Sequence, residues 1–408
     1  MLQRITFSPQ APTPLSDIRV VDLSRLVAGN MLSLQLADHG AEVIKIEDPR
    51  TGDPLRAWRW NGQSLYWKVY GRNKKSLALD LRADAGRHVL RDLLATAHVM
   101  LENFRPGTLE QMGLGPDVLH VLNPKLVIVR ITGFGQDGPY RDRPGFGTLV
   151  EAMSGFAAKN GFEDRPPVLP PLAMADMVSG LYGAYGVMIA LRVAEQSGRG
   201  QVIDLPLLEP VISVLGPDAA IYRATKEKPQ RTGSRSLTTS PRNVYRTRDG
   251  RHIAISASIQ TMAERVFRAI GRSDMIDDPR FRTNSDRVRN IDACDGAVAD
   301  FIAERTLAEN MAIFEQAEVT AHPVYEIDQL LEDPHVHERG VIVEAPDVET
   351  GSVLMHNIIP RLSETPGRLR YPAPSLGQHS REILVSIGRD AEQLAALAAA
   401  GVIKEASP

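Results

Sequence analysis

The sequence contains a single cysteine, Cys294, among its 408 residues. One cysteine excludes a disulfide within the chain and fits a reducing compartment. Neither a histidine nor a second cysteine lies near it in the sequence. We therefore expect its thiol to be a small packing group in a helix, not part of a metal site.

Long apolar runs and a strong charge imbalance are also absent. The N-terminus has no apolar core of the length that a signal peptide needs, and no run approaches the length of a membrane-spanning helix. The formal net charge of −3 gives no excess of basic residues for general nucleic-acid binding. We expect a cytoplasmic protein with no membrane partner and no nucleic-acid partner.

The motifs of three common enzyme classes are missing. Residues 27–30 follow a predicted strand but contain only Gly29, whereas a dinucleotide-binding loop needs three glycines in G-x-G-x-x-G. His335 and His337 are two residues apart, and the chain has no H-E-x-x-H motif or cysteine pair. No G-x-S-x-G elbow occurs either. The sequence disfavours an NAD-dependent dehydrogenase, a metal enzyme and a serine hydrolase.

The chain does contain regular alternation of strands and helices. Short apolar runs predict strands at 18–23, 42–47, 76–81, 98–102, 126–132 and 201–205. Helical spacing lies between them, at 31–39, 83–96, around Leu109 and at about 176–195. This alternation indicates an α/β domain with a parallel sheet and right-handed crossovers.

The pattern also suggests a second domain. Residues 225–240 are basic and rich in turn formers, and hairpin-like strands at 243–247 and 252–256 follow them. Three helices come next, and the last part of the chain returns to helix and strands. We assign residues 15–224 to a large domain, 225–329 to a small α+β domain, and 330–408 to a return to the large domain.

One acidic residue stands out in residues 172–191. Asp176 heads about four helical turns of apolar and small residues, with no Lys or Glu in the run. This composition predicts a helix inside the protein. Asp176 is then either an N-cap, the commonest use of Asp in such a place, or a chemical group.

Basic residues lie close to two predicted strand ends. Lys74 and Lys75 come just before one strand, and Arg105 follows another beside Phe104. Ligands bind at loops next to strand ends in α/β sheets, and Lys and Arg suit phosphates there. An aromatic ring beside cations can also stack on a base. Solvated surface turns are the alternative interpretation.

Six segments together resemble the family III CoA-transferases, which include formyl-CoA, carnitine and dicarboxylate CoA-transferases and the related α-methylacyl-CoA racemases. The segments are VVDL at 20–23, AEVIKIE at 41–47, NKKSLALD at 73–80, ENFRPG at 102–107, GFGQDGPY at 133–140 and Ala175-Asp176. They occur in the family's order from about Leu15 to Ile387, and that order makes the match specific.

The resemblance implies a Rossmann-like large domain built from both chain ends, a small domain and an interlocked homodimer. It implies acyl-CoA and a small organic acid as substrates, with no permanently bound cofactor and no metal. Asp176 matches the family's catalytic aspartate. The residues that match CoA contacts are Arg25, Leu26, Ala28, Leu79, Asn103 and Phe104, to which we add Lys74, Lys75 and Arg105 as candidates for the phosphates.

The family's mechanism gives Asp176 its role. The aspartate attacks the donor thioester to give a mixed anhydride and CoA thiolate, and the thiolate then forms an aspartyl-CoA thioester. The acceptor carboxylate attacks that thioester, and the steps run back to the new acyl-CoA. Burial alone would protonate the aspartate, and a helix N-terminus opposes this with free N–H groups and a favourable dipole.

Several alternatives to a succinyl-CoA transferase remain in view. Racemases carry a proton-exchanging histidine where this chain has Phe146, which argues against racemisation. Formyl-CoA transferases carry an acid at Gly147 and arginines at Asp48 and Gln111. Residues 144–148 together with 151–155 are instead similar to enzymes of succinyl-CoA and other dicarboxylates. Arg235 is a candidate for the substrate carboxylate, and a non-catalytic acyl-CoA-binding protein is the further alternative.

Overall fold

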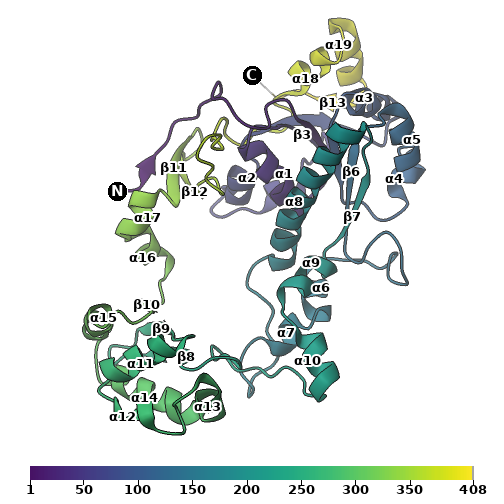
Figure 1. Ribbon diagram of the computed structural model, residues 1–408. Coiled ribbons are helices and arrows are strands. Elements are labelled where there is room, and N and C mark those ends of the chain that lie inside the picture. The colour runs from purple at the N-terminus through teal and green to yellow at the C-terminus, as the bar shows by residue number, and fades with distance from the viewer. Residues whose placement is uncertain (407–408) are drawn as a thin grey trace. The chain divides into compact units, whose positions relative to one another are not determined.

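The computed structural model describes residues 1–406, and its chain divides into two compact units (Figure 1). Unit 1 contains Met1–Phe156, Leu169–Pro217 and the chain from Pro334 onward. Unit 2 contains Ala157–Val168 and Asp218–Asp333. Both ends of the described chain therefore belong to one unit.

These boundaries differ from the predicted domains at one place in particular. Residues 157–168, which we assigned to the large domain, belong to unit 2. The backbone N–H of Gly233 donates to the carbonyl of Gly161 at 2.8 Å, and Phe162 forms a β-bridge with Thr232. This segment is bound to residues about seventy positions later in the chain, so its local sequence does not indicate that it belongs to unit 2.

Unit 1 is built on a seven-stranded sheet with the order β13-β4-β3-β2-β5-β6-β7. Its strands are β2 (Arg19–Asp22), β3 (Glu42–Glu47), β4 (Lys74–Leu79), β5 (Val99–Glu102), β6 (Val127–Thr132), β7 (Val202–Pro206) and β13 (Ile403–Lys404). All neighbours are parallel except β13, which pairs antiparallel with β4. The strand order reverses between β2 and β5, and in such sheets the crevice beyond the strands' carboxyl ends at this point binds ligands.

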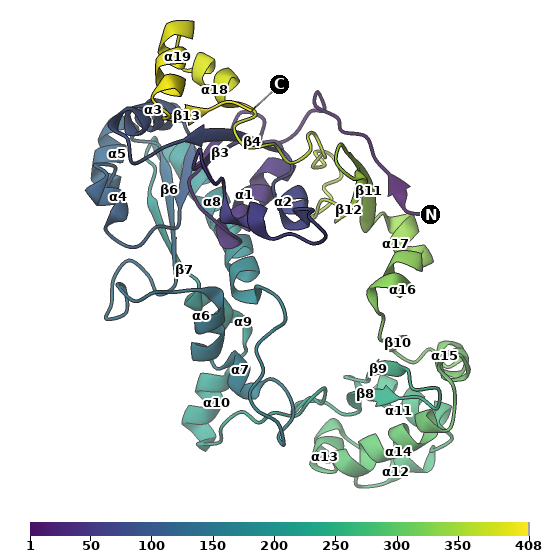
Figure 2. The same cartoon turned by 180° about the vertical axis from the view of Figure 1, so that it is seen from behind.

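Alternating side chains of the sheet contribute to two apolar cores. Val20 belongs to the core that includes α1 (Ala28–Asp38) and α8 (Met174–Ser197). Val21 points to the other face and belongs to the core with α3 (Asp84–Leu94). The other helices of this second core are α4 (Thr108–Gln111), α5 (Pro116–Leu122), α18 (Ser380–Ser386) and α19 (Ala391–Ala399). The C-terminal elements α18 and β13 lie beside β4, and α19 packs on β13 (Figure 2).

Unit 1 has a second, three-stranded sheet of β1 (Gln3–Arg4), β11 (Ile342–Asp347) and β12 (Gly351–His356). The N-terminal strand β1 pairs parallel with β11, more than 330 residues later in the chain. The remaining helices of unit 1 are η1 (Pro54–Ala57), α2 (Leu65–Tyr70), α6 (Gly147–Met153), α9 (Leu208–Val214) and α17 (Pro334–Arg339).

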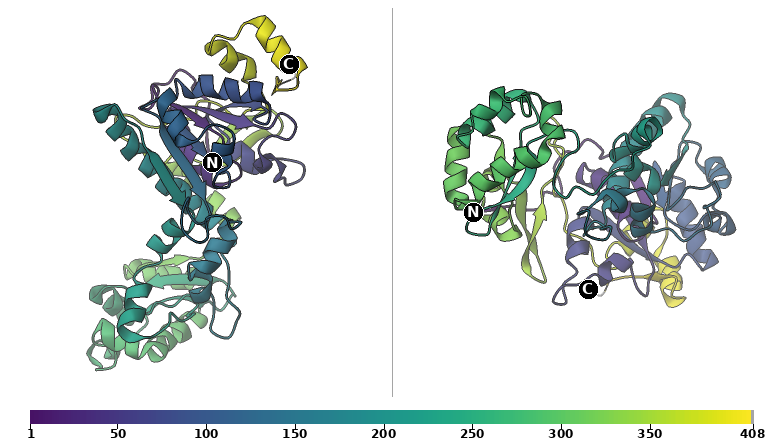
Figure 3. Two further views of the ribbon diagram at one scale, coloured as in Figure 1. Left: turned by 90° about the vertical axis from the view of Figure 1, so that its right-hand side faces the viewer. Right: turned by 90° about the horizontal axis from the view of Figure 1, so that it is seen from below.

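Unit 2 packs helices against an antiparallel sheet of β8 (Arg242–Arg246), β9 (His252–Ser256) and β10 (Ala321–Pro323) (Figure 3). Its helices are α10 (Asp218–Thr225), α11 (Gln260–Ala269), α12 (Asp274–Asp277), α13 (Asn284–Arg289), α14 (Ile291–Ala303), α15 (Leu307–Gln316) and α16 (Ile327–Glu332), and α7 (Phe156–Lys159) begins at the unit boundary. Cys294 is fully buried in α14 within this core.

Helix α8 corrects two sequence-based expectations. Among the described residues it is the one helix long and apolar enough to cross a membrane, a test that the core helix of a soluble protein also passes. It is also not wholly internal. One face packs on α1, α9, β6 and β7, whereas the other exposes Leu181, Tyr182, Tyr185, Met188, Ile189 and Val193.

Glycines allow α8 to approach α1 closely. A Cβ at Gly180 would lie 2.7 Å from Met31 Cβ and 2.9 Å from the carbonyl oxygen of Ala28. At Gly183 it would lie 2.4 Å from Leu32 Cδ1. All three distances are too short for non-bonded atoms, so the absence of side chains at Gly180 and Gly183 allows this spacing of the two helices.

We expect Gly180→Ala to destabilise unit 1 by about 1–3 kcal/mol, because the methyl group would overpack the α1–α8 contact. Urea unfolding followed by tryptophan fluorescence measures this directly, since Trp58, Trp60 and Trp67 all lie in unit 1.

Gly186→Ala is the matched control. A Cβ at Gly186 meets no atom closer than 3.8 Å, so helix propensity should stabilise this variant by up to about 1 kcal/mol. Equal unfolding midpoints for the two variants would contradict the packing argument.

Candidate active site

Asp176 lies in the first turn of α8, where the chain meets the start of α1. The N-cap of α8 is Ala173, and the helix begins at Met174. Asp176 is therefore the third helical residue and not the N-cap that its pattern alone favours. The backbone N–H groups of Ala28 and of Asp176 itself lie near its carboxylate and favour the ionised form.

The surroundings of Asp176 raise the pKa of its carboxyl group to about 6. Burial is the largest cause and the negative charge of Glu151 is the second, while the two backbone N–H groups oppose them. The group is partly buried yet largely ionised above neutral pH. This is the combination that a carboxylate nucleophile requires.

Glu151 of α6 is a buried acid that sequence analysis did not single out. It is 3% exposed, and its Oε1 accepts a hydrogen bond from the backbone N–H of Ala175 at 2.9 Å. The EAMSG segment that contains it attracted attention only through its resemblance to other sequences. A glutamate on a short helix gives no local sign of a partner 24 residues away.

The loop before α1 is held in an unusual conformation by two polar residues. Leu26 has a left-handed φ of 65°. Asn103, beyond the end of β5, accepts from the N–H of Arg25 at 2.9 Å and donates to its carbonyl oxygen at 2.8 Å. Asp53 accepts from the N–H of Leu26 at 3.0 Å. These contacts set the path of the loop that leads to Ala28 and Asp176.

A buried polar network contacts this loop through Asp53 and holds it in place. Lys45 forms ion pairs with Asp22 at 3.1 Å and with Asp53 at 3.2 Å. Asn30 donates from Nδ2 to Asp53 at 2.9 Å and accepts from Lys74 Nζ at 2.9 Å. Buried charges of this kind are tolerated only when paired, so the network restricts the positions of all its members.

The network corrects the expectation for Lys74. Its side chain is fully buried, with 1% of the residue exposed, and its Nζ also donates to the carbonyl of Asn30 at 3.0 Å. Burial lowers the pKa of Lys74 to about 7. A ligand phosphate cannot reach it, because the protein itself surrounds the ammonium group.

Two further basic candidates have acidic partners of their own. Lys75 forms ion pairs with Glu42 at 2.8 Å and Glu382 at 2.7 Å. Arg235, in unit 2, pairs with Asp292 at 2.7 Å and Asp295 at 2.8 Å. Their charges stabilise the fold locally, so the structure supports neither Lys75 as a phosphate ligand nor Arg235 as a carboxylate ligand.

Most of the other candidates surround two adjoining cavities of unit 1. Asp176 opens to a cavity of about 400 Å³ whose lining includes Arg25, Leu26, Ala28, Asn103, Phe104, Arg105 and Phe146. A second cavity of about 550 Å³ is lined by Arg25, Leu79 and Phe104 among others. Arg25, Pro54 and Phe104 line both cavities. Together they lie at the crevice predicted by the strand order.

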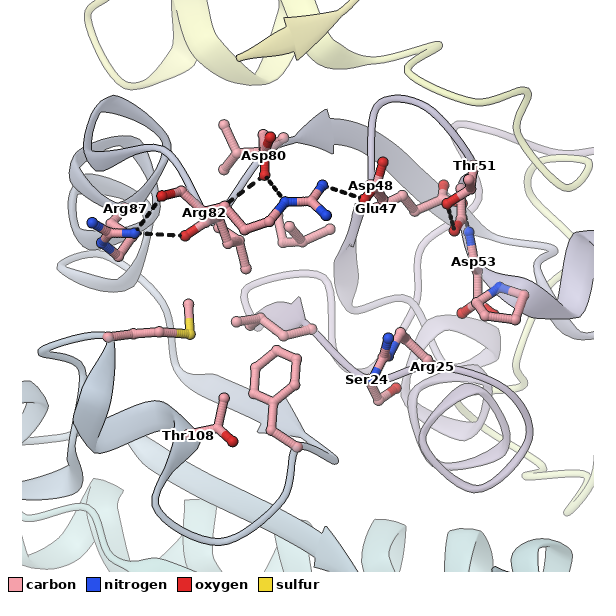
Figure 4. Close-up of a pocket in the computed structure, with 18 residues that line it drawn as sticks. Ser24, Arg25, Glu47, Asp48, Thr51, Asp53, Asp80, Arg82, Arg87 and Thr108 are labelled. Carbon is pink, nitrogen blue, oxygen red and sulfur yellow. Dashed lines mark hydrogen bonds and ion pairs between the residues drawn. The ribbon is translucent and has the colours of Figure 1, made fainter. Parts of the chain in front are cut away.

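The wall of the larger cavity carries a chain of ion pairs (Figure 4). Arg82 lies between Asp80 at 2.9 Å and Asp48 at 2.5 Å, and Arg50 also pairs with Asp48 at 3.1 Å. These guanidinium groups hold the pKa of Asp48 well below its usual range. Formyl-CoA transferases carry an arginine at the position of Asp48. In this chain the guanidinium group of Arg82 lies beside that position, because it forms an ion pair with Asp48.

The smaller cavity combines one acid with several cations. Arg141 and Arg143, from the Gly- and Pro-rich loop before α6, line it together with Arg25 and Arg105. The guanidinium of Arg143 stacks on Tyr140 at 3.6 Å. Within residues 1–406, no group of three or more His, Cys, Asp or Glu is arranged to hold a metal ion. The arrangement suits a nucleophilic carboxylate facing an anionic ligand.

Comparison with known proteins agrees with this chemistry. The profile of "CoA-transferase family III" matches residues 15–380. The chain belongs to CoA-transferase family III. Succinyl-CoA–D-citramalate CoA-transferase of Chloroflexus aurantiacus is 40% identical over 97% of this chain and 100% of its own. Succinate–glutarate CoA-transferase of Agrobacterium fabrum is 36% identical over 94% and 98%.

Solved structures agree with the fold. A CAIB/BAIF family protein from Brucella suis has a TM-score of 0.81 and 30% identity, and the match covers 92% of this chain and 100% of that chain. The expected α/β class and the family resemblance are therefore confirmed. This family III enzyme is a CoA-transferase.

We expect Gly147→Ala to abolish most covalent labelling of this CoA-transferase by an acyl-CoA. A Cβ at Gly147 would lie 2.4 Å from Asp176 Oδ2, so the carboxylate must move. Displacement of a reacting group by about 1 Å costs on the order of 10²-fold in rate. Mass spectrometry of the Asp176 peptide after incubation with acyl-CoA measures the loss.

The same labelling should be retained in Gly186→Ala, where the added methyl group has space on the same helix as Asp176. Normal labelling of Gly147→Ala would show that the carboxylate does not depend on this contact.

Proposed function

We propose that this protein transfers CoA from succinyl-CoA to a small carboxylic acid through covalent intermediates on Asp176. The observation that carries the proposal is the partly buried, largely ionised carboxylate at the start of α8, open to an arginine-lined cavity. The named relatives support the donor, because the Chloroflexus aurantiacus enzymes use succinyl-CoA with D-citramalate or L-malate.

In this proposal the nucleotide end of CoA lies in the larger cavity and its thiol end lies in the cavity that contains Asp176. The larger cavity takes the nucleotide, with Leu79 on its wall and Arg25 near the phosphates. Phe104, which lines both cavities, lies where the pantetheine arm passes toward Asp176. Leu26, Ala28, Asn103 and Arg105 line the second part of this path.

The reaction begins when a carboxylate oxygen of Asp176 attacks the thioester carbonyl carbon. The carbon–sulfur bond breaks, the electron pair leaves with CoA thiolate, and an aspartyl anhydride forms. The thiolate then attacks the aspartyl carbonyl, which releases succinate and leaves aspartyl-CoA. The acceptor carboxylate reverses both steps, so no net proton, water or metal ion is consumed.

The acceptor is a dicarboxylic or similarly polar acid. Arg141 and Arg143 line the cavity that contains Asp176, and guanidinium groups bind carboxylates through paired hydrogen bonds. Phe146 and Gly147 belong to the segment between these arginines and Asp176. Phenylalanine has no exchangeable proton, which disfavours the racemase alternative at this position.

The enzyme acts as a cytoplasmic homodimer with the family's Rossmann-like domain and interlocked chains. The six exposed apolar residues of α8 support association, since monomers rarely expose contiguous apolar patches of this kind. Tyr185, 66% exposed, lies among them.

Asp176→Ala should lose CoA transfer entirely, because no other group can carry the anhydride. Incubation of the parent protein with succinyl-CoA, followed by hydroxylamine or borohydride and peptide mapping, should show modification at Asp176 that the variant lacks. Modification elsewhere, or transfer by the variant, would exclude the mechanism.

The same assay separates the alternatives. An unmodified protein that still binds succinyl-CoA would be a non-catalytic binding protein, and exchange of the α-hydrogen of a 2-methylacyl-CoA with deuterium would indicate a racemase. Transfer from other acyl-CoA donors but not from succinyl-CoA would change the substrate and leave the class intact.

For the dimer, we expect Tyr185→Glu combined with Ile189→Glu to shift the protein toward the monomer in analytical ultracentrifugation, because two charges would be buried at the contact. Val121→Glu is the control, since Val121 is also an exposed apolar residue of a unit 1 helix, at 86% exposure. Dimers that survive the α8 substitutions would place the contact elsewhere.

A further inference from the structure

Glu151 occupies a position that the mechanism above does not explain. A buried carboxylate usually pairs with a cation, because an unpaired buried charge is costly. Here its Oε1 accepts a hydrogen bond from the N–H of Ala175, the residue just before Asp176, at 2.9 Å. A second acid therefore lies beside the nucleophile and is anchored to the same helical turn.

The group that holds Glu151 is the backbone N–H of Ala175, which could donate to a neutral side chain equally well. The N–H groups in the first turn of a helix have no acceptor within the helix, and Glu151 supplies one for Ala175. A glutamine side chain would supply the same acceptor without charge. Hydrogen bonding alone therefore does not account for a glutamate.

We propose that Glu151 is a positioning residue that holds the first turn of α8 and, through its negative charge, makes the Asp176 carboxylate a stronger nucleophile. This role rests on the function proposed above. As Asp176 attacks the thioester, its charge passes to the departing thiolate, and the repulsion between the two carboxylates is relieved. The charge of Glu151 thus destabilises the reactant carboxylate more than the anhydride.

The other charged groups around Asp176 do not reproduce this effect. Four arginines line its cavity from the surrounding loops. The elements packed on α8 carry four other charged residues. Asp38 pairs with Arg72, and Arg130 pairs with Glu102. Asp204 accepts a hydrogen bond from the N–H of Gln136, and Glu209 is exposed. Glu151 is the acid whose charge raises the pKa of Asp176.

The test measures how fast CoA becomes attached to Asp176 as a function of pH. The parent enzyme is mixed with succinyl-CoA without an acceptor acid, quenched in acid and analysed by mass spectrometry. The rate should rise with a midpoint near pH 6, as the carboxylate ionises. In Glu151→Gln the midpoint should fall by about one pH unit, since a like charge has been removed.

The maximal rate of Glu151→Gln should also fall, by less than about ten-fold, because a less basic nucleophile reacts more slowly with a Brønsted slope below one. Glu151→Asp keeps the charge and should keep the parent midpoint. Glu195→Gln is the matched control: it makes the same change at the far end of α8, where Glu195 is exposed and 3.7 Å from Arg192.

An unchanged midpoint in Glu151→Gln would overturn the proposal and reduce Glu151 to a helix cap. Failure of Glu151→Gln to fold would overturn it as well, because the charge would then serve folding instead of the nucleophile. Absence of CoA from Asp176 in the parent enzyme is a different outcome, which rejects the proposed function itself.

Discussion

The close contact between α1 and α8 is the constraint on which the site depends. Gly180 and Gly183 let the two helices approach until the carboxylate of Asp176 reaches the backbone N–H of Ala28. That N–H has no acceptor within α1, since it belongs to the first turn. The start of α1 therefore stabilises the negative charge of Asp176 on α8, at a cavity from which solvent is partly excluded.

The same contact connects Asp176, the proposed nucleophile, to the loop that precedes α1. Asn103 and Asp53 hold this loop by its backbone, and Lys45 fixes Asp53 in turn. A displacement of the loop would move Ala28, whose backbone N–H favours the ionised form of Asp176. In the proposed function, substrate binding and chemistry would share this one support, as precise positioning of a reacting group requires.

Charge is distributed unevenly around this support. In the buried network that holds the loop, Lys45 pairs with both Asp22 and Asp53 away from water. On the cavity side, arginines line a pocket whose one acidic lining residue is Asp176, the proposed nucleophile. Such a surface attracts anionic CoA thioesters and carboxylic acids. The neighbouring acid, Glu151, faces the backbone and influences the nucleophile without occupying the cavity.

Local sequence patterns predicted much of the fold. Apolar runs identified the six parallel strands, because a buried strand needs a continuous stretch of apolar side chains. They missed α19 and the edge strand β13. Asp176 was found by composition, as one acid heading an apolar run, and its role came from the order of motifs along the chain.

What the tertiary structure decided concerns partners that are distant in sequence. A lysine before a buried strand gives the same pattern whether its ammonium group meets solvent or, like that of Lys74, meets Asn30. The sequence likewise does not reveal that Glu151 accepts a hydrogen bond from the N–H of Ala175, because this contact exists only once α6 packs beside α8. The sequence by itself determined the parallel strands and the apolar helix that carries Asp176 in its first turn, because these follow from local periodicity and composition. Packing alone decided which charged groups face the ligand and which support the fold.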